Sequence, residues 1–244
     1  MNADPAAQRR LLDLADTDAE LDRTAHRRRT LAELAEIAGL EAQLRARRDA
    51  VIAADTLISD LDRDSRRLET EIEAVRARED RDRNLLKQGV GARQVSDLEH
   101  ELDTLQRRQA ALEDDLLELM ERRENADADA AKAREALAAT EAQLADATGR
   151  RDAAFTELDD LVRRRTADRA ALTAELPADL LTLYDRIRAQ KGTGAALLRS
   201  RRCGACRLEL DRSALVKLRD AAPDAVLRCE ECGVVLIRTP QSGL

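Results

Sequence analysis

Aromatic residues are almost absent from this sequence. Its 244 residues include one Phe, one Tyr and no Trp. Aromatic side chains dominate burial in most globular cores, so a compact enzyme-like core is not expected. His26 and His100 are the only histidines, and no phosphate-binding glycine loop or nucleophile motif is present. We therefore expect no enzymatic activity, no catalytic residues and no small-molecule substrate.

Long apolar runs are also missing. No segment approaches the roughly 20 apolar residues that a transmembrane helix needs, and residues 1–10 lack the apolar stretch of a signal peptide. We therefore expect a cytoplasmic protein without a membrane partner. In a reducing compartment, cysteines that occur only as two CxxC pairs indicate metal binding or redox chemistry more often than disulfides.

The residues that are abundant favour long helices. Charged residues make up 37% of the chain, and the 43% that are hydrophobic are mostly Ala and Leu. A first helix is predicted to begin at Pro5 with Asp4 as its N-cap. From Val51 to Val75 the apolar residues are spaced alternately by three and four, which is the heptad pattern of a coiled coil.

A glycine pair interrupts this helical pattern near the middle of its length. Gly89 and Gly91 precede Ser96–Glu99, which has the capping-box spacing that opens a helix. Two helical stretches of similar length joined by a short loop favour an antiparallel hairpin within one chain, and hence a monomer. The alternative is a parallel dimer of long helices. In the hairpin, the numbers of opposed residues are expected to sum to about 180. The alanine-rich stretch 126–133 is then expected opposite Ala50, Ala53 and Ala54, with a bend near residue 31.

The predicted fold class is mainly α, with a long antiparallel coiled-coil hairpin followed by a small C-terminal β zinc ribbon. Residues 1–176 form the hairpin, with its loop near 87–95, and residues 177–244 form a short helix plus the ribbon. Pro177 marks the boundary, because the residue before a proline is disfavoured in a helix. A second short helix is possible at 213–219, and residues 234–237 are predicted to form a final strand.

The four cysteines predict a metal site. Cys203 and Cys206 form one pair, Cys229 and Cys232 the other, and 22 residues separate the pairs. Each CxxC turn can present two thiolates, so four thiolates close a tetrahedral site around one structural Zn²⁺ per chain. Mononuclear iron would use the same ligands. A thioredoxin-type dithiol is not favoured, because it needs an α/β fold.

The charge distribution predicts a nucleic-acid partner. The chain carries a net charge of −7, yet residues 186–238 hold 12 basic and 6 acidic residues. A basic ribbon can contact RNA phosphates, without base stacking because no aromatic residue follows residue 190. We expect modest, salt-sensitive RNA binding by a non-enzymatic adaptor. The candidate contacts are Arg199, Arg201, Arg202, Arg207, Lys217, Arg228 and Arg238.

Several segments resemble a known family, the bacterial C4-type zinc-ribbon proteins in which a long coiled-coil hairpin precedes the ribbon. The resemblance covers essentially the whole chain and is strongest at residues 85–90, 112–121 and 184–188 and at the two cysteine pairs. It implies binding of RNA and of protein clients. Val234 departs from the pattern, since relatives carry Arg after the last CxxCG. The alternative function is a chaperone-like scaffold that docks protein clients on the coiled coil and ribbon.

Overall fold

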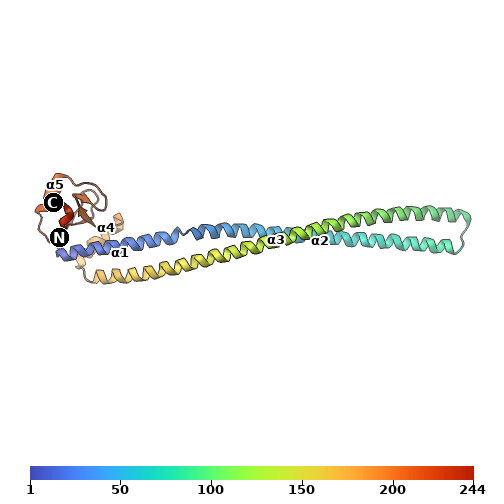
Figure 1. Ribbon diagram of the computed structural model, residues 1–244, viewed down its shortest axis with the longest axis horizontal. Helices are drawn as coiled ribbons and strands as arrows, with labels where there is room; N and C mark the ends of the chain where they lie inside the picture. Colours follow the sequence, from blue (N-terminus) through green and yellow to red (C-terminus); the bar gives the residue numbers. More distant parts are fainter. The chain divides into compact units, whose positions relative to one another are not determined.

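Helices account for most of the chain in the computed structural model, which describes residues 1–244. The helices are α1 (Pro5–Arg29), α2 (Ala32–Lys87), α3 (Ala92–Ala174), α4 (Ala178–Lys191) and α5 (Arg212–Asp220). The strands are β1 (Ala195–Arg199), β2 (Arg202–Cys203), β3 (Leu227–Arg228) and β4 (Val235–Ile237), followed by a 3-10 turn, Pro240–Ser242. The predicted fold class, a long helical hairpin followed by a small C-terminal strand region, is confirmed (Figure 1). No helix is both long enough and apolar enough to span a membrane.

The chain divides into two compact units. One consists of Ala35–Thr148, and the other joins Met1–Leu34 to Gly149–Leu244. We call the first the hairpin unit and the second the head unit. The boundary expected after residue 176 corresponds to the turn between α3 and α4, inside the head unit.

The hairpin unit consists of two antiparallel helices with an apolar seam. On α2 the seam includes Leu61, Leu68, Ile72 and Val75, all of them buried and all predicted from the heptad spacing. Residues 88–91 connect α2 to α3. Gly89 in this loop has a φ of 81°, a left-handed conformation that glycine adopts without steric cost.

Helix α3 begins earlier than the sequence indicated. The backbone N–H of Val95 donates to the Gly91 carbonyl at 3.0 Å, so the helix begins at Ala92 and Ser96 lies within it. The predicted capping box at Ser96–Glu99 was therefore wrong as a helix start. The backbone hydrogen bond forms the first turn without a side-chain cap.

Ion pairs across the hairpin show its axial register. Asp55 pairs with Arg134 at 2.5 Å, and Asp62 pairs with Arg123. Ala54 therefore lies opposite residues near 134, at the end of the alanine-rich stretch 126–133 that was expected there. The residue numbers of these two pairs sum to 189 and 185, so the expected sum of about 180 was too low. Heptad spacing specifies which face of a helix is buried, but it leaves the axial position of the partner helix open.

The break in the first helical stretch lies where a bend was expected. Helix α1 begins at Pro5, and the Asp4 carboxylate accepts from the Ala6 N–H at 2.7 Å as the predicted N-cap. The helix ends at Arg29, and α2 begins at Ala32. The bend expected near residue 31 is thus a two-residue interruption at residues 30–31.

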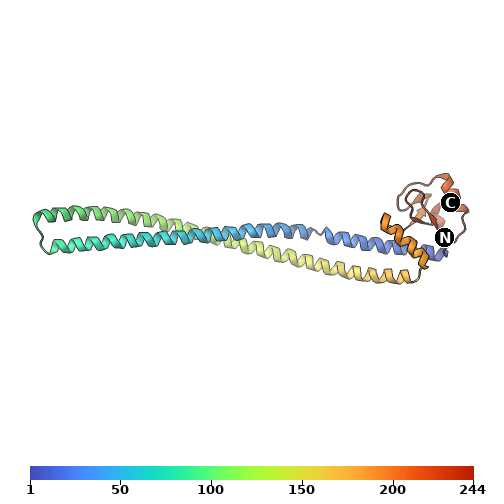
Figure 2. The same cartoon turned by 180° about the vertical axis from the view of Figure 1, so that it is seen from behind.

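In the head unit, a four-stranded sheet packs with α1 and α4. The strand order is β2-β1-β4-β3, with β1 parallel to β4 and the two outer pairs antiparallel. In both views α4 and the start of α1 lie beside the strands (Figures 1 and 2). One continuous core results. Its fully buried residues include Leu11, Leu14, Leu180, Tyr184, Leu198, Val235, Leu236 and Ile237.

A buried carboxylate joins three helices of the head unit, α1, α3 and α4. Asp18 on α1 is only 2% exposed. It accepts a hydrogen bond from the Tyr184 hydroxyl at 2.8 Å, and it pairs with Arg169 on α3 at 2.8 Å and with Arg188 on α4 at 3.1 Å. Burial, and then the hydrogen bond to Asp18, raise the pKa of Tyr184. Tyr184 and Arg188 both come from the 184–188 segment that carries the family resemblance.

Replacing this carboxylate should destabilise the head unit. Asp18→Asn leaves Arg169 and Arg188, both about a quarter exposed, without their buried counter-charge, and we expect a loss of about 2–3 kcal/mol. The loss in the free energy of unfolding is measured by urea unfolding, monitored through the near-UV circular dichroism of Tyr184, the only tyrosine. Asp22→Asn, at an exposed partner of Arg188, is the matched control and should cost at most about 0.5 kcal/mol. Equal losses for the two variants would contradict this role for Asp18.

Candidate metal centre

Each CxxC pair forms a tight turn next to a strand. In the first turn the Arg207 N–H donates to the Cys203 carbonyl at 2.8 Å, and in the second the Gly233 N–H donates to the Cys229 carbonyl at 2.9 Å. The first pair begins at the end of β2, and the second lies between β3 and β4. Because β1 pairs with both β2 and β4, the sheet brings the two turns to the same site.

The backbone after each turn is left-handed. Gly233 has a φ of 80°, and Arg207, at the equivalent place in the first turn, has a φ of 63°. Glycine adopts this conformation without steric cost, whereas a residue with a Cβ, such as arginine, seldom does. Gly204 serves another purpose, since a Cβ there would lie 2.8 Å from the Leu197 carbonyl oxygen.

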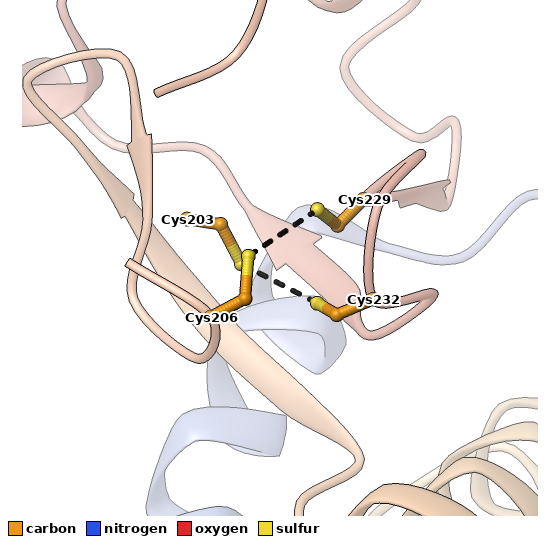
Figure 3. Close-up of side chains that lie close together, drawn as sticks. All are labelled: Cys203, Cys206, Cys229 and Cys232. Atoms are coloured by element: carbon orange, nitrogen blue, oxygen red, sulfur yellow. Dashed lines mark hydrogen bonds between the residues drawn. The ribbon is translucent and has the colours of Figure 1, made fainter. Parts of the chain in front are cut away.

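The four sulfur atoms converge with spacing that fits a metal ion (Figure 3). The Sγ atoms of Cys203 and Cys232 are 3.7 Å apart, those of Cys206 and Cys229 are 4.0 Å apart, and all four lie within 4.8 Å of one another. Zn–S bonds of about 2.3 Å in a tetrahedron place sulfurs about 3.8 Å apart. The cysteines are thus placed for zinc, and four thiolates leave no open position for catalysis.

The protein environment disfavours the ionised form of two of the four thiols. Burial raises the pKa of Cys203 to about 12 and also raises the pKa of Cys232. The backbone N–H of Leu208 lowers the pKa of the half-buried Cys206. A bound cation would stabilise all four thiolates, so we expect metal binding and folding of the ribbon to be coupled.

The residues predicted to contact RNA differ in their solvent exposure. Arg199, Arg201 and Arg202 surround the turn between β1 and β2 and are exposed, as are Arg207, Lys217 and Arg228. Arg238 is half-buried and donates to the carbonyls of Leu218, Ala221, Ala222 and Pro223 at the end of α5. Its guanidinium thus satisfies the last carbonyls of a helix.

Most of the exposed candidates also have intramolecular partners. Lys217 pairs with Glu230 at 2.9 Å, Arg202 with Glu209 at 3.4 Å, and the side chains of Arg201 and Arg228 donate to the carbonyls of Gly243 and Gly233. The side chains of Arg199 and Arg207 form no hydrogen bond or ion pair. Val234, the departure noted from the family pattern, is buried in the core.

Loss of one thiolate should unfold the ribbon selectively. Cys229→Ser, or chelation of the metal, should abolish the near-UV signal of Tyr184, because that side chain shares its core with Cys203 and Cys229. Most of the far-UV helical signal should remain, since the hairpin unit has its own seam. Val216→Ser, at an exposed position of α5, is the control and should leave both signals unchanged. Metal-free protein with an ordered head would refute the coupling.

Comparisons with known proteins agree with this geometry. The chain is 47% identical over 239 residues to an uncharacterized protein of Mycobacterium tuberculosis, and the match covers 98% of each chain. It is 37% identical over 227 residues to an uncharacterized protein of Mycobacterium leprae, and that match covers 91% of this chain and 96% of the other. A solved structure from Mycobacterium smegmatis has a TM-score of 0.87 at 44% identity, covering 98% of this chain and 100% of that one. CT398 from Chlamydia trachomatis has the same fold, with a TM-score of 0.69 at 18% identity over 95% and 97% of the two chains.

Two family descriptions match adjacent parts of the chain. Residues 202–236 match the C4-type zinc ribbon domain, and residues 14–192 match the CT398-like coiled coil hairpin domain. The second match covers more than half of the sequence and includes α4. The resemblance noted from residues 85–90, 112–121 and 184–188 is thereby confirmed. The chain belongs to the family of CT398-like coiled-coil hairpin proteins that carry a C4-type zinc ribbon.

Proposed function

We propose that this protein is a non-enzymatic adaptor whose ribbon, held by one structural zinc ion, binds RNA through its phosphates. The observation that carries the proposal is the turn between β1 and β2, where Arg199, Arg201 and Arg202 are exposed on a hydrogen-bonded backbone. Arginine binds phosphate oxygens in a bidentate manner. Arg207, whose side chain forms no hydrogen bond or ion pair, adds a fourth guanidinium after the first cysteine pair.

Long-range contacts hold this turn in an unfavourable conformation. Ser200 and Arg201 have φ angles of 47° and 66°, which residues with a Cβ seldom adopt. Their N–H groups donate to the carbonyls of Gln241 and Ser242 at 2.9 and 2.8 Å, and the Ser242 hydroxyl donates to the Leu198 carbonyl at 2.9 Å. Local strain that the surroundings maintain is characteristic of functional sites.

Charge without aromatic surface favours contacts to the RNA backbone over contacts to bases. Tyr184 is fully buried, and no aromatic residue follows it. Residues 186–238 keep their basic excess even after zinc and four thiolates contribute a net −2. Sequence-independent, salt-sensitive affinity is the expected form of binding.

The shared core determines how the proposal is tested. Leu11 and Leu14 of α1 are completely buried in the same core as the sheet. A fragment that begins after α3 would expose that apolar surface, so RNA binding by an isolated ribbon is not a sound measure. The test therefore uses the full chain.

Charge reversal at the turn should weaken RNA binding. The variant Arg199→Glu with Arg202→Glu should bind RNAs of different sequence more weakly to a similar degree, and should flatten the dependence of log affinity on log salt by about 1 for each lost phosphate contact. Gel-shift titrations at two salt concentrations measure this. The control Arg107→Glu with Arg163→Glu changes the net charge equally at exposed α3 positions. An equal loss in the control, or no binding by the unaltered chain at low salt, would contradict the proposal.

A substitution at Arg207 should change RNA affinity without lowering the stability of the head unit. Arg207→Gly removes the guanidinium but relieves the left-handed conformation, so the head unit should be as stable as before or more stable by up to about 1 kcal/mol. RNA affinity should nevertheless fall. Thermal unfolding monitored at Tyr184 and gel-shift titration on the same samples provide the two values. Unchanged RNA affinity would remove Arg207 from the interface.

A further inference from the structure

A groove in the hairpin unit lies between α2 and α3, with a volume of about 390 Å³. Ile72 of α2 and Leu116 of α3 contribute apolar surface to it, as does the more exposed Leu117. Its charged lining consists of Glu69, Glu73 and Arg76 of α2 and Glu113 of α3. All of these residues belong to the hairpin unit, so the groove is formed without the ribbon.

Two large apolar side chains beside this groove are left in solvent. Leu117 is 60% exposed, and Met120, one helical turn later on the same face, is 50% exposed. The hairpin does not use them for its own seam, which takes the half-buried Leu112, Leu116 and Leu119 from the same stretch of α3. Neighbouring exposed apolar residues of this size mark an interaction surface more often than isolated ones do.

The surroundings of this apolar surface are acidic. On α3 the residues at i−4, i−3, i+4 and i+7 from Leu117 are Glu113, Asp114, Glu121 and Glu124, which share its face of the helix. Only Glu113 has partners, Gln109 at 2.7 Å and Arg76 at 2.6 Å. The hydrogen bond from Gln109, and then that from Arg76, lower the pKa of Glu113. The carboxylates of Asp114, Glu121, Glu124, Glu69 and Glu73 have no ion pair.

The unpaired carboxylates around the groove determine which kind of partner can bind there. A second copy of the chain docked through the same face would bring two acidic rims together, which is unfavourable. RNA would meet the same repulsion from its phosphates. A helix with apolar residues on one face and Lys or Arg at its edges would instead bury Leu117 and Met120 while neutralising the unpaired carboxylates.

We propose that the groove between Ile72, Leu116 and Leu117, together with Met120, is a docking site for a basic amphipathic helix of a protein partner. Leu and Met suit such a site, because the flexible thioether of Met adapts to different apolar side chains. An amphipathic helix docks in a groove through anchors at i, i+3, i+4 and i+7. The site includes residues of the 112–121 segment, which contributes to neither the zinc centre nor the RNA interface. The proposed docking does not depend on RNA binding.

A designed peptide tests the site directly. The probe is a fluorescein-labelled helix of Leu and Lys with leucines at i, i+3, i+4 and i+7, titrated with the full-length protein and followed by fluorescence anisotropy. Leu117→Gln with Met120→Gln should weaken its binding by about tenfold or more, because two apolar contacts are lost. Gln is a good helix former, so the far-UV signal should be unchanged. Glu69→Lys with Glu73→Lys should also weaken binding, and the matching Leu–Glu peptide should not bind the unaltered chain.

The control variant separates specific docking from general attraction to an acidic chain. Ile52→Gln with Leu57→Gln replaces two exposed apolar residues elsewhere on α2 and should change affinity by no more than about twofold. An equal loss in both double variants would overturn the proposal, as would equal affinity for the Leu–Glu peptide. So would a dimer in sedimentation velocity that only the Leu117 and Met120 variant dissociates, since the surface would then be covered by a second copy.

Discussion

The head unit depends on one contact, the burial of β4 between its neighbouring strands and the helices α1 and α4. Val235, Leu236 and Ile237 are buried along the whole strand, in the same core as Leu11 and Leu14. A chain with one Tyr and one Phe has little large apolar surface with which to fill a core, so the ribbon obtains part of that surface from α1. The parallel pairing of β1 with β4 then brings the cysteine turns together, and the metal site follows from the packing.

Two polar anchors complete this arrangement. Asp18 connects α1, α3 and α4 through Tyr184, Arg169 and Arg188, and the four cysteines are placed to connect the two turns through a cation. Each anchor buries charge that is favourable only when its partners are present. Both therefore favour one specific arrangement of the unit over other packings of similar apolar area.

The two proposed binding surfaces are chemically opposite. The turn around Ser200 and Arg201 carries positive charge on a strained backbone without aromatic residues, which suits phosphates. The groove beside Leu117 combines apolar surface with unpaired carboxylates, which suits a basic amphipathic helix. A polyanion favours the first and is repelled by the second. This chemical separation is consistent with an adaptor that binds partners of two kinds.

The sequence by itself determined the features that depend on local spacing: the helical hairpin, its glycine loop, the N-cap at Asp4, the break near residue 31 and the cysteine quartet. Periodicity and short turns are read from neighbouring residues, so they predict which face is buried and where a turn forms. Only the tertiary structure decided the start of α3 at Ala92, the residues opposite Ala54, the left-handed conformation of Arg207 and the role of Arg238 at the end of α5. It also decided that Asp18 is buried. These features depend on the axial position of a partner helix or on hydrogen bonds to residues distant in the chain, and no local pattern encodes such contacts.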